Sequence, residues 1–574
     1  MKRKINFTPV YRTSQVFTLF VLIALSGCEQ PTNSPSDPNS AFPLTSAYNE
    51  NIRTIITTDL EVDDLNSMAH MLLYANEINI IGLIYSDSQY HFTGYPGGLI
   101  YGVLPTDNGF NWPITSNTSN DKMSWHIDLA VDAYEDAYQN LVRHDTNYPP
   151  PYKLRHSIYD GNISGNPAIP QKSEGSNFIV KVLMDDAPGK VFIQCWGGMT
   201  TVARALRTIR ETYQSDAVWS SLKQKISNKL VITSFGFQDN GGTAGQTYIT
   251  EIGQYWPDIQ HRQVSSIIWG YSGAEAVFEK DADKMKALWL LNNVTDVGPL
   301  GAIYTIAGVR ARGSTWGTND IPYWLYQETD PAKLDEQSEI ISGMGYHPVR
   351  MRVYGDWVSE GDSSNWALLV DNGLRSWEHP TWGGWGGRQI RRPNITDNGT
   401  SVFPVGVTPD MWTNSPADTW TTGAGEYNKD NETSQNTNDS AAARWFGYMM
   451  NDFATRLQWS IKPPEECNHE PVIAVSNNIT GDETLDFRAA KGTSITLTAS
   501  LSDPDNNQVH VRWWQYKEAD TYTGDAGIPE FNSAITFTVP DNADSGSTIH
   551  IIAEATDNGT PSLTSWQRIV VTVQ

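Results

Sequence analysis

The segment between residues 53 and 85 constrains the fold of this chain most, because it reads as one complete β-α-β unit. Apolar strands are predicted over 53–57 and 78–85, and a helix is predicted between them over 64–74. Apolar side chains in that helix recur at the i, i+3, i+4 and i+7 spacing of one buried face, at Leu65, Met68, Ala69 and Leu72. The unit therefore predicts two parallel strands of an α/β sheet.

The same alternation continues to about residue 460. Short apolar runs typical of buried strands occur at 191–195 and 230–234, and segments with helical spacing occur at 177–184 and 200–213. A last helix is predicted over 441–459, after a loop-rich stretch. We therefore predict an α/β domain over residues 48–460, built on a mainly parallel sheet with flanking helices.

The turn of the first unit is strongly acidic. Asp59, Glu61, Asp63 and Asp64 place four carboxylates within six residues, and these repel one another unless a cation or protons compensate. Ligands of open parallel sheets bind beyond the carboxyl ends of the strands, where this turn lies. Oxygen ligands favour a hard cation, Ca²⁺ or Mg²⁺. The alternative is that Asp59 or Asp63 only caps free N–H groups of the first helical turn.

The acidic turn also carries a family resemblance. Its Asp-x-Glu-x-Asp-Asp pattern resembles the signature of the Ca²⁺-dependent nucleoside hydrolases, and more closely that of the nucleoside-hydrolase-like domain in bacterial exported proteins described as cellulose-binding. The resemblance implies that Asp59 and Asp64 are calcium ligands and that Asp63 faces sugar hydroxyls. Thr57 stands where the hydrolases have their first aspartate, and Glu61 where they have glycine. Glu61 is therefore expected to add a contact or an acid.

Two later segments resemble further parts of the calcium shell of that family. Residues 195–203 resemble its Gly-x-Thr-Asn-x-Ala segment, which implies that the Thr200 carbonyl binds calcium, with Thr201 where asparagine is usual. Asp362 supplies the late aspartate of the shell, and Gly361 stands where the family often has a histidine that helps the base to leave. The alternatives are a helix N-cap for Thr200 and a solvated loop acid for Asp362.

Two groups of side chains are candidates for substrate contacts. The first follows the strand predicted over 230–234 and comprises Gln238, Asp239 and Asn240, which suit sugar hydroxyls but also ordinary turn chemistry. The second lies in a loop rich in glycine and tryptophan and comprises Glu378, His379, Trp382 and Trp385. Indole rings stack on the apolar faces of sugars. The alternative is that these rings form a buried aromatic clamp that holds the loop.

The resemblance implies a calcium-dependent hydrolase that cleaves a glycosyl bond, either an N-glycosyl bond or one in a small glycan. Its catalytic residues would be Asp59, which takes a proton from the attacking water, together with Glu61 and Asp63 at the sugar. The competing interpretation is a non-catalytic lipoprotein that binds cellulose or another polysaccharide, and a third is an assembly or adhesion protein. The expected partner is a carbohydrate or a nucleoside-like small molecule. The sequence gives no information about the oligomeric state.

The first 47 residues are expected to direct the protein rather than to fold. Residues 1–27 combine a basic start with a short apolar run and read as a signal peptide. The sequence Leu-Ser-Gly-Cys that ends at Cys28 matches a bacterial lipoprotein cleavage box, which predicts a lipid anchor on Cys28 and a protein at the outer membrane or cell surface. Residues 28–47 then form a flexible tether. Ordinary secretion is the alternative.

After residue 470 the pattern changes to period two, with turn signals at short intervals. The clearest predicted strands are 494–499, 509–514, 535–539 and 568–573. A run of about 100 residues of this kind predicts a β-sandwich over 470–574. Its turns resemble those of bacterial immunoglobulin-like and cadherin-like modules, in which Asp503 and Asp505 either form turns or bind Ca²⁺.

The net charge and the cysteine content argue against two further classes, proteins that bind nucleic acid polymers and proteins held together by disulfides. Removal of residues 1–27 takes away four positive charges and moves the net charge from −25 to −29, which argues against nucleic acid as a bound polymer. Besides Cys28 the chain contains only Cys195 and Cys467. A disulfide framework is therefore excluded.

Overall fold

The structure is a computed structural model of the chain, which divides into two units, residues 1–44 and 45–574. The residues that it describes are 52–59, 62–88, 126–163, 171–239, 247–264, 279–285, 287–295, 297–304, 358, 360–392, 396–397, 400–414, 440–481 and 484–574. The predicted signal peptide, the tether and Cys28 lie outside these ranges, as do Glu61 and Asn240.

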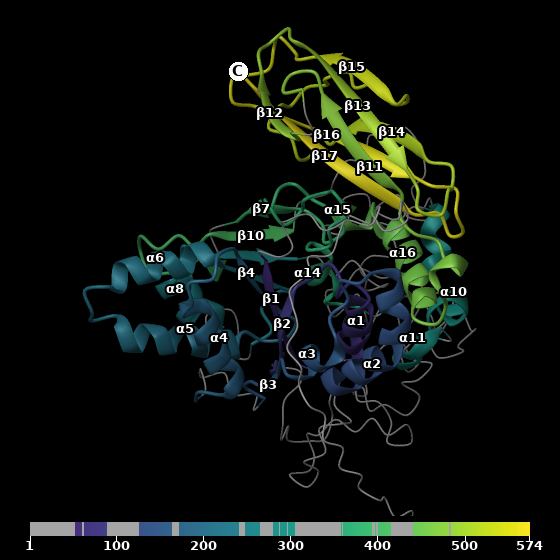
Figure 1. Cartoon of the computed structure of the whole chain (residues 1–574). Coiled ribbons are helices and arrows are strands. Elements are labelled where there is room, and N and C mark those ends of the chain that lie inside the picture. Colours follow the sequence, from purple (N-terminus) through teal and green to yellow (C-terminus); the bar gives the residue numbers. More distant parts are fainter. Residues whose placement is uncertain are drawn as a thin grey trace, which may run out of the picture. The chain divides into compact units, whose positions relative to one another are not determined.

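A large sheet runs through the α/β part of the chain (Figure 1). Among the described residues it has eight strands in the order β3-β2-β1-β4-β5-β6-β10-β7. All neighbouring strands pair in parallel except β10 and β7, which confirms the predicted mainly parallel sheet. The strands are β1 (Arg53–Thr58), β2 (Ile80–Tyr85), β3 (Ile158–Asp160), β4 (Val191–Cys195), β5 (Leu230–Ser234), β6 (Gln260–Gln263), β10 (Met411–Asn414) and β7 (Gln389–Arg391).

Helices cover both faces of this sheet, and strand β1 shows why. Its successive side chains point to opposite faces, so that Ile55 packs in one core cluster and Ile56 in the other. Figure 1 shows α4, α5 and α6 on one side of the strands and α1, α2, α11 and α16 on the other. No helix in the described ranges is long and apolar enough to cross a membrane. The main helices are α1 (Val62–Leu72), α2 (His126–His144), α3 (Pro151–Arg155), α4 (Glu174–Met184), α5 (Thr200–Tyr213), α6 (Trp219–Lys229), α8 (Gly253–Tyr255), α10 (Ala287–Leu290), α11 (Gly298–Ile303), α14 (Ser363–Ala367), α15 (Ser440–Ala443) and α16 (Phe446–Trp459).

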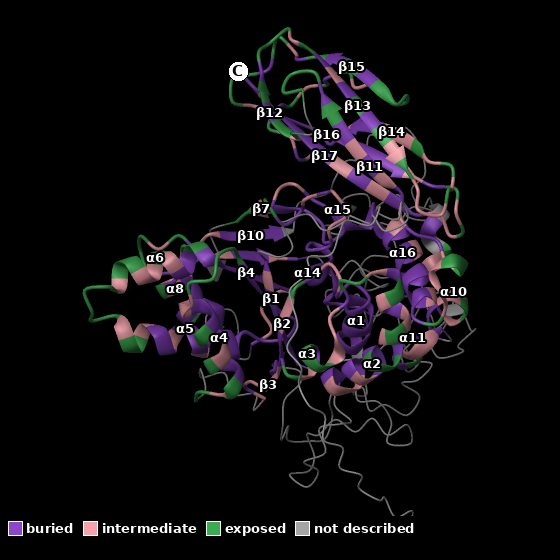
Figure 2. Cartoon of the chain, in the orientation of Figure 1, coloured by how far each residue is buried: buried purple, intermediate pink, exposed green. Residues whose placement is uncertain are grey.

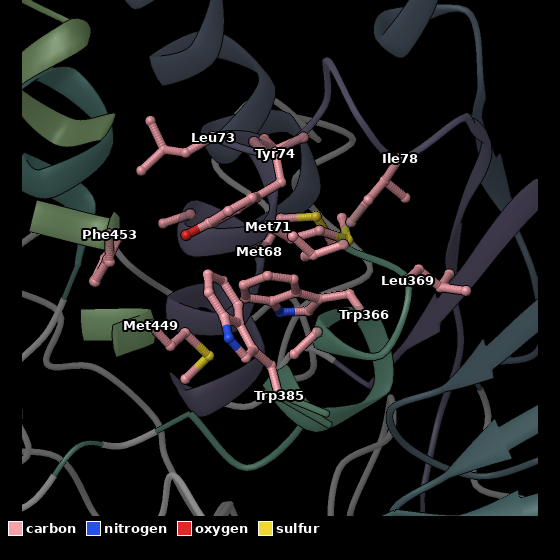
Figure 3. Close-up of a cluster of buried hydrophobic side chains, with 14 of the residues drawn as sticks. Met68, Met71, Leu73, Tyr74, Ile78, Trp366, Leu369, Trp385, Met449 and Phe453 are labelled. Carbon is pink, nitrogen blue, oxygen red and sulfur yellow. The ribbon is translucent and has the colours of Figure 1, made fainter. Parts of the chain in front are cut away.

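Helix α1 departs from the prediction of a single buried face. Every side chain from Asp63 to Leu72 is buried, and Figure 2 colours the helix accordingly. The reason is that α2, α11 and α14 all pack against it. Figure 3 shows the apolar part of these surroundings, a core cluster that includes Met68, Trp366 and Trp385. The polar side chains of α1 therefore need hydrogen-bond partners inside the protein.

The C-terminal residues form two sheets, β11-β13-β15 and β12-β17-β16-β14, which share one apolar core. Strand β13 shows the predicted alternation, since Ile495 and Leu497 are buried while Ser494 and Thr498 are exposed. This architecture confirms the predicted β-sandwich. Its strands are β11 (Val472–Asn477), β12 (Asp486–Ala489), β13 (Ser494–Ser502), β14 (His510–Gln515), β15 (Ala534–Thr538), β16 (Thr548–Thr556) and β17 (Thr564–Val573).

Backbone hydrogen bonds connect the sandwich to the loop that precedes the tryptophan-rich segment. The N–H group of Trp566 donates to the Asn372 carbonyl at 3.0 Å, and that of Arg568 donates to the Gly373 carbonyl at 3.1 Å. Gly373 has a φ of +83°, and a Cβ atom there would lie 1.7 Å from the Trp566 carbonyl oxygen. Only glycine fits this contact, so the loop and strand β17 are held at backbone distance.

Acid is expected to destabilise the protein through His261 in strand β6. This side chain is fully buried, its Nε2 lies 2.9 Å from Ser234 Oγ, and burial lowers its pKa to about 3. The folded protein keeps this ring neutral below pH 6.5, whereas the unfolded chain protonates it. The stability contributed by His261 is therefore present above pH 6.5 and falls by about 2 kcal/mol on going to pH 4.5. Urea unfolding at several pH values measures this slope.

The variant His261→Gln should weaken that pH dependence over the range from pH 6.5 to pH 4.5. The matched control is His510→Gln, because His510 is exposed on β14. An equal slope in the wild type and in His261→Gln would contradict the prediction.

Candidate functional site

Three acidic side chains gather where strand β1 ends and helix α1 begins. Asp59 directly follows β1, and Asp63 and Asp64 lie in the first turn of α1. All three are buried, with at most 4% of the side chain exposed. The free N–H groups and the dipole of a helix N-terminus favour negative charge, so they partly stabilise the ionised carboxylates at this position.

A fourth carboxylate reaches this place from a distant segment. Asp362 is the N-cap residue of α14 and is 2% exposed. Carboxylate oxygens of Asp63, Asp64 and Asp362 all lie within 4.8 Å of one another, an arrangement that could hold one metal ion. The preceding residue also takes part, since the Gly361 N–H group donates to Asp63 Oδ2 at 3.1 Å. We call Asp63, Asp64 and Asp362 the carboxylate cluster.

Burial and neighbouring negative charges both affect the pKa of one carboxylate in the cluster, that of Asp64. Burial raises the pKa of Asp64 well above its usual range, and the negative charges of Asp59 and Asp63 raise it further. The hydroxyl of Thr58 donates a hydrogen bond to Asp64 Oδ1, which opposes this rise. A bound cation relieves the same repulsion without requiring a proton.

The turn after strand β4 lies against Asp59. The N–H group of Trp196 donates to the Thr57 carbonyl at 2.8 Å, because β1 and β4 are neighbours in the sheet. A Cβ atom on Gly197 would lie 2.6 Å from the Asp59 Cβ, and one on Gly198 would lie 2.6 Å from Asp239 Oδ1. The two glycines therefore let this turn approach both carboxylates closely.

Thr200 is the first residue of α5, directly after that turn. Its hydroxyl donates to Asp87 Oδ1 at 2.7 Å and accepts from Asn162 Nδ2 at 2.9 Å. Asn162 Nδ2 also lies 3.0 Å from Asp87 Oδ2. Neither Asp87 nor Asn162 was predicted from the sequence as a site residue. Asp87 lies just after apolar strand β2, much as Asp59 lies just after β1. An aspartate in this position could have indicated a site residue from the sequence alone.

Asp239 and Gln238 hold the glycine turn from the other side. Asp239 Oδ1 accepts from the Met199 N–H group at 3.0 Å, and Gln238 Nε2 donates to the Trp196 carbonyl at 2.8 Å. Burial raises the pKa of Asp239 to about 6, although backbone donors at the start of α5 lower it. Both side chains predicted to contact a substrate thus fix the backbone beside Asp59.

Family models match most of the chain. Residues 53–389 match the family described as cellulose-binding Sde182, nucleoside hydrolase-like domain. The chain belongs to this family. Residues 494–573, which include strands β13 to β17 of the sandwich, match a second family, described as cellulose-binding protein Sde0182, C-terminal domain.

A solved structure shares the fold of this Sde182-family chain. A nucleoside hydrolase-related hypothetical protein from Saccharophagus degradans, described as associated with carbohydrate metabolism, is 23% identical to it. The match has a TM-score of 0.62 and covers 91% of this chain and 100% of that chain. An inosine-guanosine nucleoside hydrolase is 10% identical with a TM-score of 0.30, over 72% of this chain and 98% of that chain. No curated protein matches the chain.

The structure brings together most of the ligands predicted from the family resemblance. Asp64 and Asp362 belong to the carboxylate cluster. Asp63, which was expected to face sugar hydroxyls, is its third member. Asp59 lies beside Asp64 and raises the pKa of that residue. Thr200 occupies the predicted helix start, and a role for its carbonyl as a ligand stays a prediction.

The tryptophan-rich loop of this Sde182-family chain contains a buried ring. Trp385 is 2% exposed, and its indole lies edge-on to the rings of Tyr74 and Trp566 with centroids 6.1 Å away in each case. This placement corrects the predicted sugar stacking for Trp385, because a buried indole has no free face for a sugar ring. The ring instead forms the buried aromatic clamp that was the alternative.

The other three predicted contact residues of that loop are more accessible than Trp385. Trp382 is half-buried, and the guanidinium carbon of Arg375 lies 4.9 Å from the centre of its ring. Glu378 is exposed and accepts two hydrogen bonds from Arg375, each at 2.7 Å. His379 is exposed, and its Nδ1 lies 2.8 Å from Thr381 Oγ1. These contacts are with the loop itself rather than with the carboxylate cluster.

Proposed function

We propose that this chain is a hydrolase of glycosyl bonds that depends on a divalent cation, Ca²⁺, and acts at the cell surface. The observation that carries the proposal is the carboxylate cluster at the carboxyl end of β1, with Asp59 beside it. Ligand sites of parallel sheets lie at this edge. Membership of a nucleoside-hydrolase-like family supports a glycosyl bond as the point of cleavage.

The residues present fit a hard cation. Asp63, Asp64 and Asp362 offer only oxygen atoms, which suit Ca²⁺. Burial and then the charges of Asp59 and Asp63 raise the pKa of Asp64, and a bound cation would compensate the negative charge that both causes disfavour. When bound, the cation polarises a water molecule and offsets the charge of its ligands. The Thr200 carbonyl is a further proposed ligand, because the chain resembles the calcium-binding hydrolases there.

Asp59 is the proposed general base. Its carboxylate is buried next to the cluster and takes the proton of the attacking water. Gly197 packs against it, so any larger residue would push the carboxylate away. Asp63 and Glu61 are proposed to contact the sugar as it acquires oxocarbenium character. Gln238 and Asp239 act indirectly, by fixing the turn that borders Asp59.

Hydrolysis is tested with a panel of nucleosides and nitrophenyl glycosides, assayed with and without EDTA. We expect release that EDTA abolishes and added Ca²⁺ restores. The variant Asp59→Asn should lose activity by roughly 100-fold or more, since it removes the base. Asp145→Asn is the matched control, because in the described part of the chain Asp145 bonds to Asn76 and to its own turn. The absence of EDTA-sensitive release across the panel would overturn the proposal.

The second candidate is a non-catalytic protein that binds cellulose or a related polysaccharide. It is favoured by the two matching families, which are both described as cellulose-binding. In this case the proposed contacts are Trp382, Glu378 and His379, the predicted loop residues that are not buried. Pull-down on insoluble cellulose that EDTA does not affect, in a protein without hydrolytic activity, would favour this candidate.

The cellular location is a separate proposal that rests on the cleavage box before Cys28. Metabolic labelling with a radioactive fatty acid should mark the wild-type protein in a bacterial host. The variant Cys28→Ala should remain unlabelled and should leave the membrane fraction. Equal labelling of both proteins would contradict the lipid anchor.

A further inference from the structure

One face of helix α1 bonds along its length to the segment 360–363, which carries Asp362. Asp63, Ser67 and His70 are spaced at i, i+4 and i+7 and therefore share this face. Asp63 Oδ2 accepts from the Gly361 N–H group at 3.1 Å, and Ser67 Oγ lies 3.1 Å from Ser363 Oγ. His70 Nδ1 lies 2.8 Å from Glu360 Oε2. The segment is thus fixed to α1 at three successive points.

Glu360 is the centre of this arrangement. It is fully buried, and a charged group in that position requires several donors. Three of its contacts come from different parts of the chain: His70 Nδ1 at 2.8 Å, the Tyr304 hydroxyl at 2.6 Å and Ser363 Oγ at 2.5 Å. Tyr304 follows α11, so this bond also connects a further helix to the segment.

The surroundings keep the His70 ring in place. It stacks on Phe453 of α16 with centroids 3.6 Å apart and meets Trp366 of α14 edge-on at 4.7 Å. A ring held on two sides presents its Nδ1 atom to Glu360 in one direction only. The Glu360 carboxylate is therefore held by a donor whose own orientation is fixed by packing. Such support is typical of residues around a binding site.

We infer that Glu360 is a positioning residue, which holds Asp362 against Asp63 and Asp64 at the distances that a cation needs. Asp362 lies two residues beyond Glu360, and the residue between them bonds to Asp63. A shift of Glu360 would therefore move one ligand of the cluster relative to the other two. The inference rests on the metal site proposed above, but not on any catalytic activity.

The test is calorimetric titration of Ca²⁺ into chelator-treated full-length protein. Tyr304→Phe removes one donor to Glu360 and retains the ring, and Ser67→Ala removes a contact to Ser363. We expect the Kd for Ca²⁺ to rise roughly tenfold in Tyr304→Phe, and further in Glu360→Gln, as in other losses of supporting hydrogen bonds around metal ligands. Thermal unfolding in EDTA records the stability of each variant separately from its metal affinity.

Tyr148→Phe is the matched control. Tyr148 is equally buried and its hydroxyl donates to the Leu73 carbonyl just beyond α1, at 2.6 Å, without touching the segment 360–363. It should lose stability and keep its Kd. Unchanged affinity in Tyr304→Phe and Glu360→Gln, or an equal loss in Tyr148→Phe, would overturn the positioning role while the metal site stands. A wild-type protein that binds no Ca²⁺ would overturn both.

Discussion

Replacement of Asp64 by asparagine is expected to abolish Ca²⁺ binding. The substitution keeps the shape of the side chain and removes one negative charge from the carboxylate cluster. Two unit charges about 4 Å apart interact by about 4 kcal/mol at an effective dielectric constant of about 20, so the affinity should fall by roughly a thousandfold. Calorimetry on chelator-treated protein measures the loss directly.

The same substitution should have the opposite effect on stability when no cation is present. Burial and the charges of Asp59 and Asp63 raise the pKa of Asp64, so the ionised carboxylate opposes folding in EDTA. Asp64→Asn should therefore unfold at a higher temperature than the wild type in EDTA near neutral pH. Asp186→Asn is the control, because Asp186 is exposed and paired with Lys225. Unchanged Ca²⁺ binding in Asp64→Asn would remove this residue from the metal site.

The sequence predicted the regular elements best where an apolar run is short and bounded. Strands β4 and β5 and helix α5 have the predicted bounds, because buried parallel strands are continuously apolar and α5 has a strong helical period. Strands β7 and β10 were missed within a stretch interpreted as loop. Strand β10 is only four residues long, and its place beside β6 depends on backbone pairing rather than on an apolar pattern.

The last helix of the α/β part shows a different limit. A single helix was predicted over 441–459, but the structure has α15 and α16 with a break at Arg444 and Trp445. Both of these side chains are buried, and the guanidinium carbon of Arg444 lies 4.7 Å from the ring of Trp514 in the sandwich. A contact with a strand far along the chain thus accompanies the break, and helical periodicity contains no information about such a contact.

In the candidate site, too, the residues that are close in sequence were predicted and those joined by long-range contacts were not. Asp59, Asp63 and Asp64 were found because they are close in sequence and follow an apolar strand. Glu360 and His70 were not found, since 290 positions separate them and neither lies in a recognisable motif. The helical pattern predicted one buried face for α1, whereas the packing of α2, α11 and α14 buries its polar side chains as well. Long-range hydrogen bonds of this kind appear only once the fold is known.

Replacement of Trp385 by alanine is expected to destabilise the protein rather than to remove a sugar contact. Its indole is buried in the main core cluster between Tyr74 and Trp566. Loss of a fully buried tryptophan leaves a cavity and costs about 3–5 kcal/mol of the free energy of unfolding. Urea unfolding of Trp385→Ala against the wild type measures this cost. The half-buried neighbour Trp382 provides the comparison, and Trp382→Ala should cost less.

Cellulose pull-down of the same two variants separates packing from recognition. Trp382 retains partial exposure beside Arg375, so Trp382→Ala should weaken binding if the loop contacts a polysaccharide. An aromatic contact contributes on the order of 1 kcal/mol, which corresponds to a loss of affinity of roughly fivefold. Trp385→Ala should bind as the wild type does at temperatures where it is folded. A stable Trp385→Ala protein that no longer binds cellulose would show instead that this ring turns outward to meet the ligand.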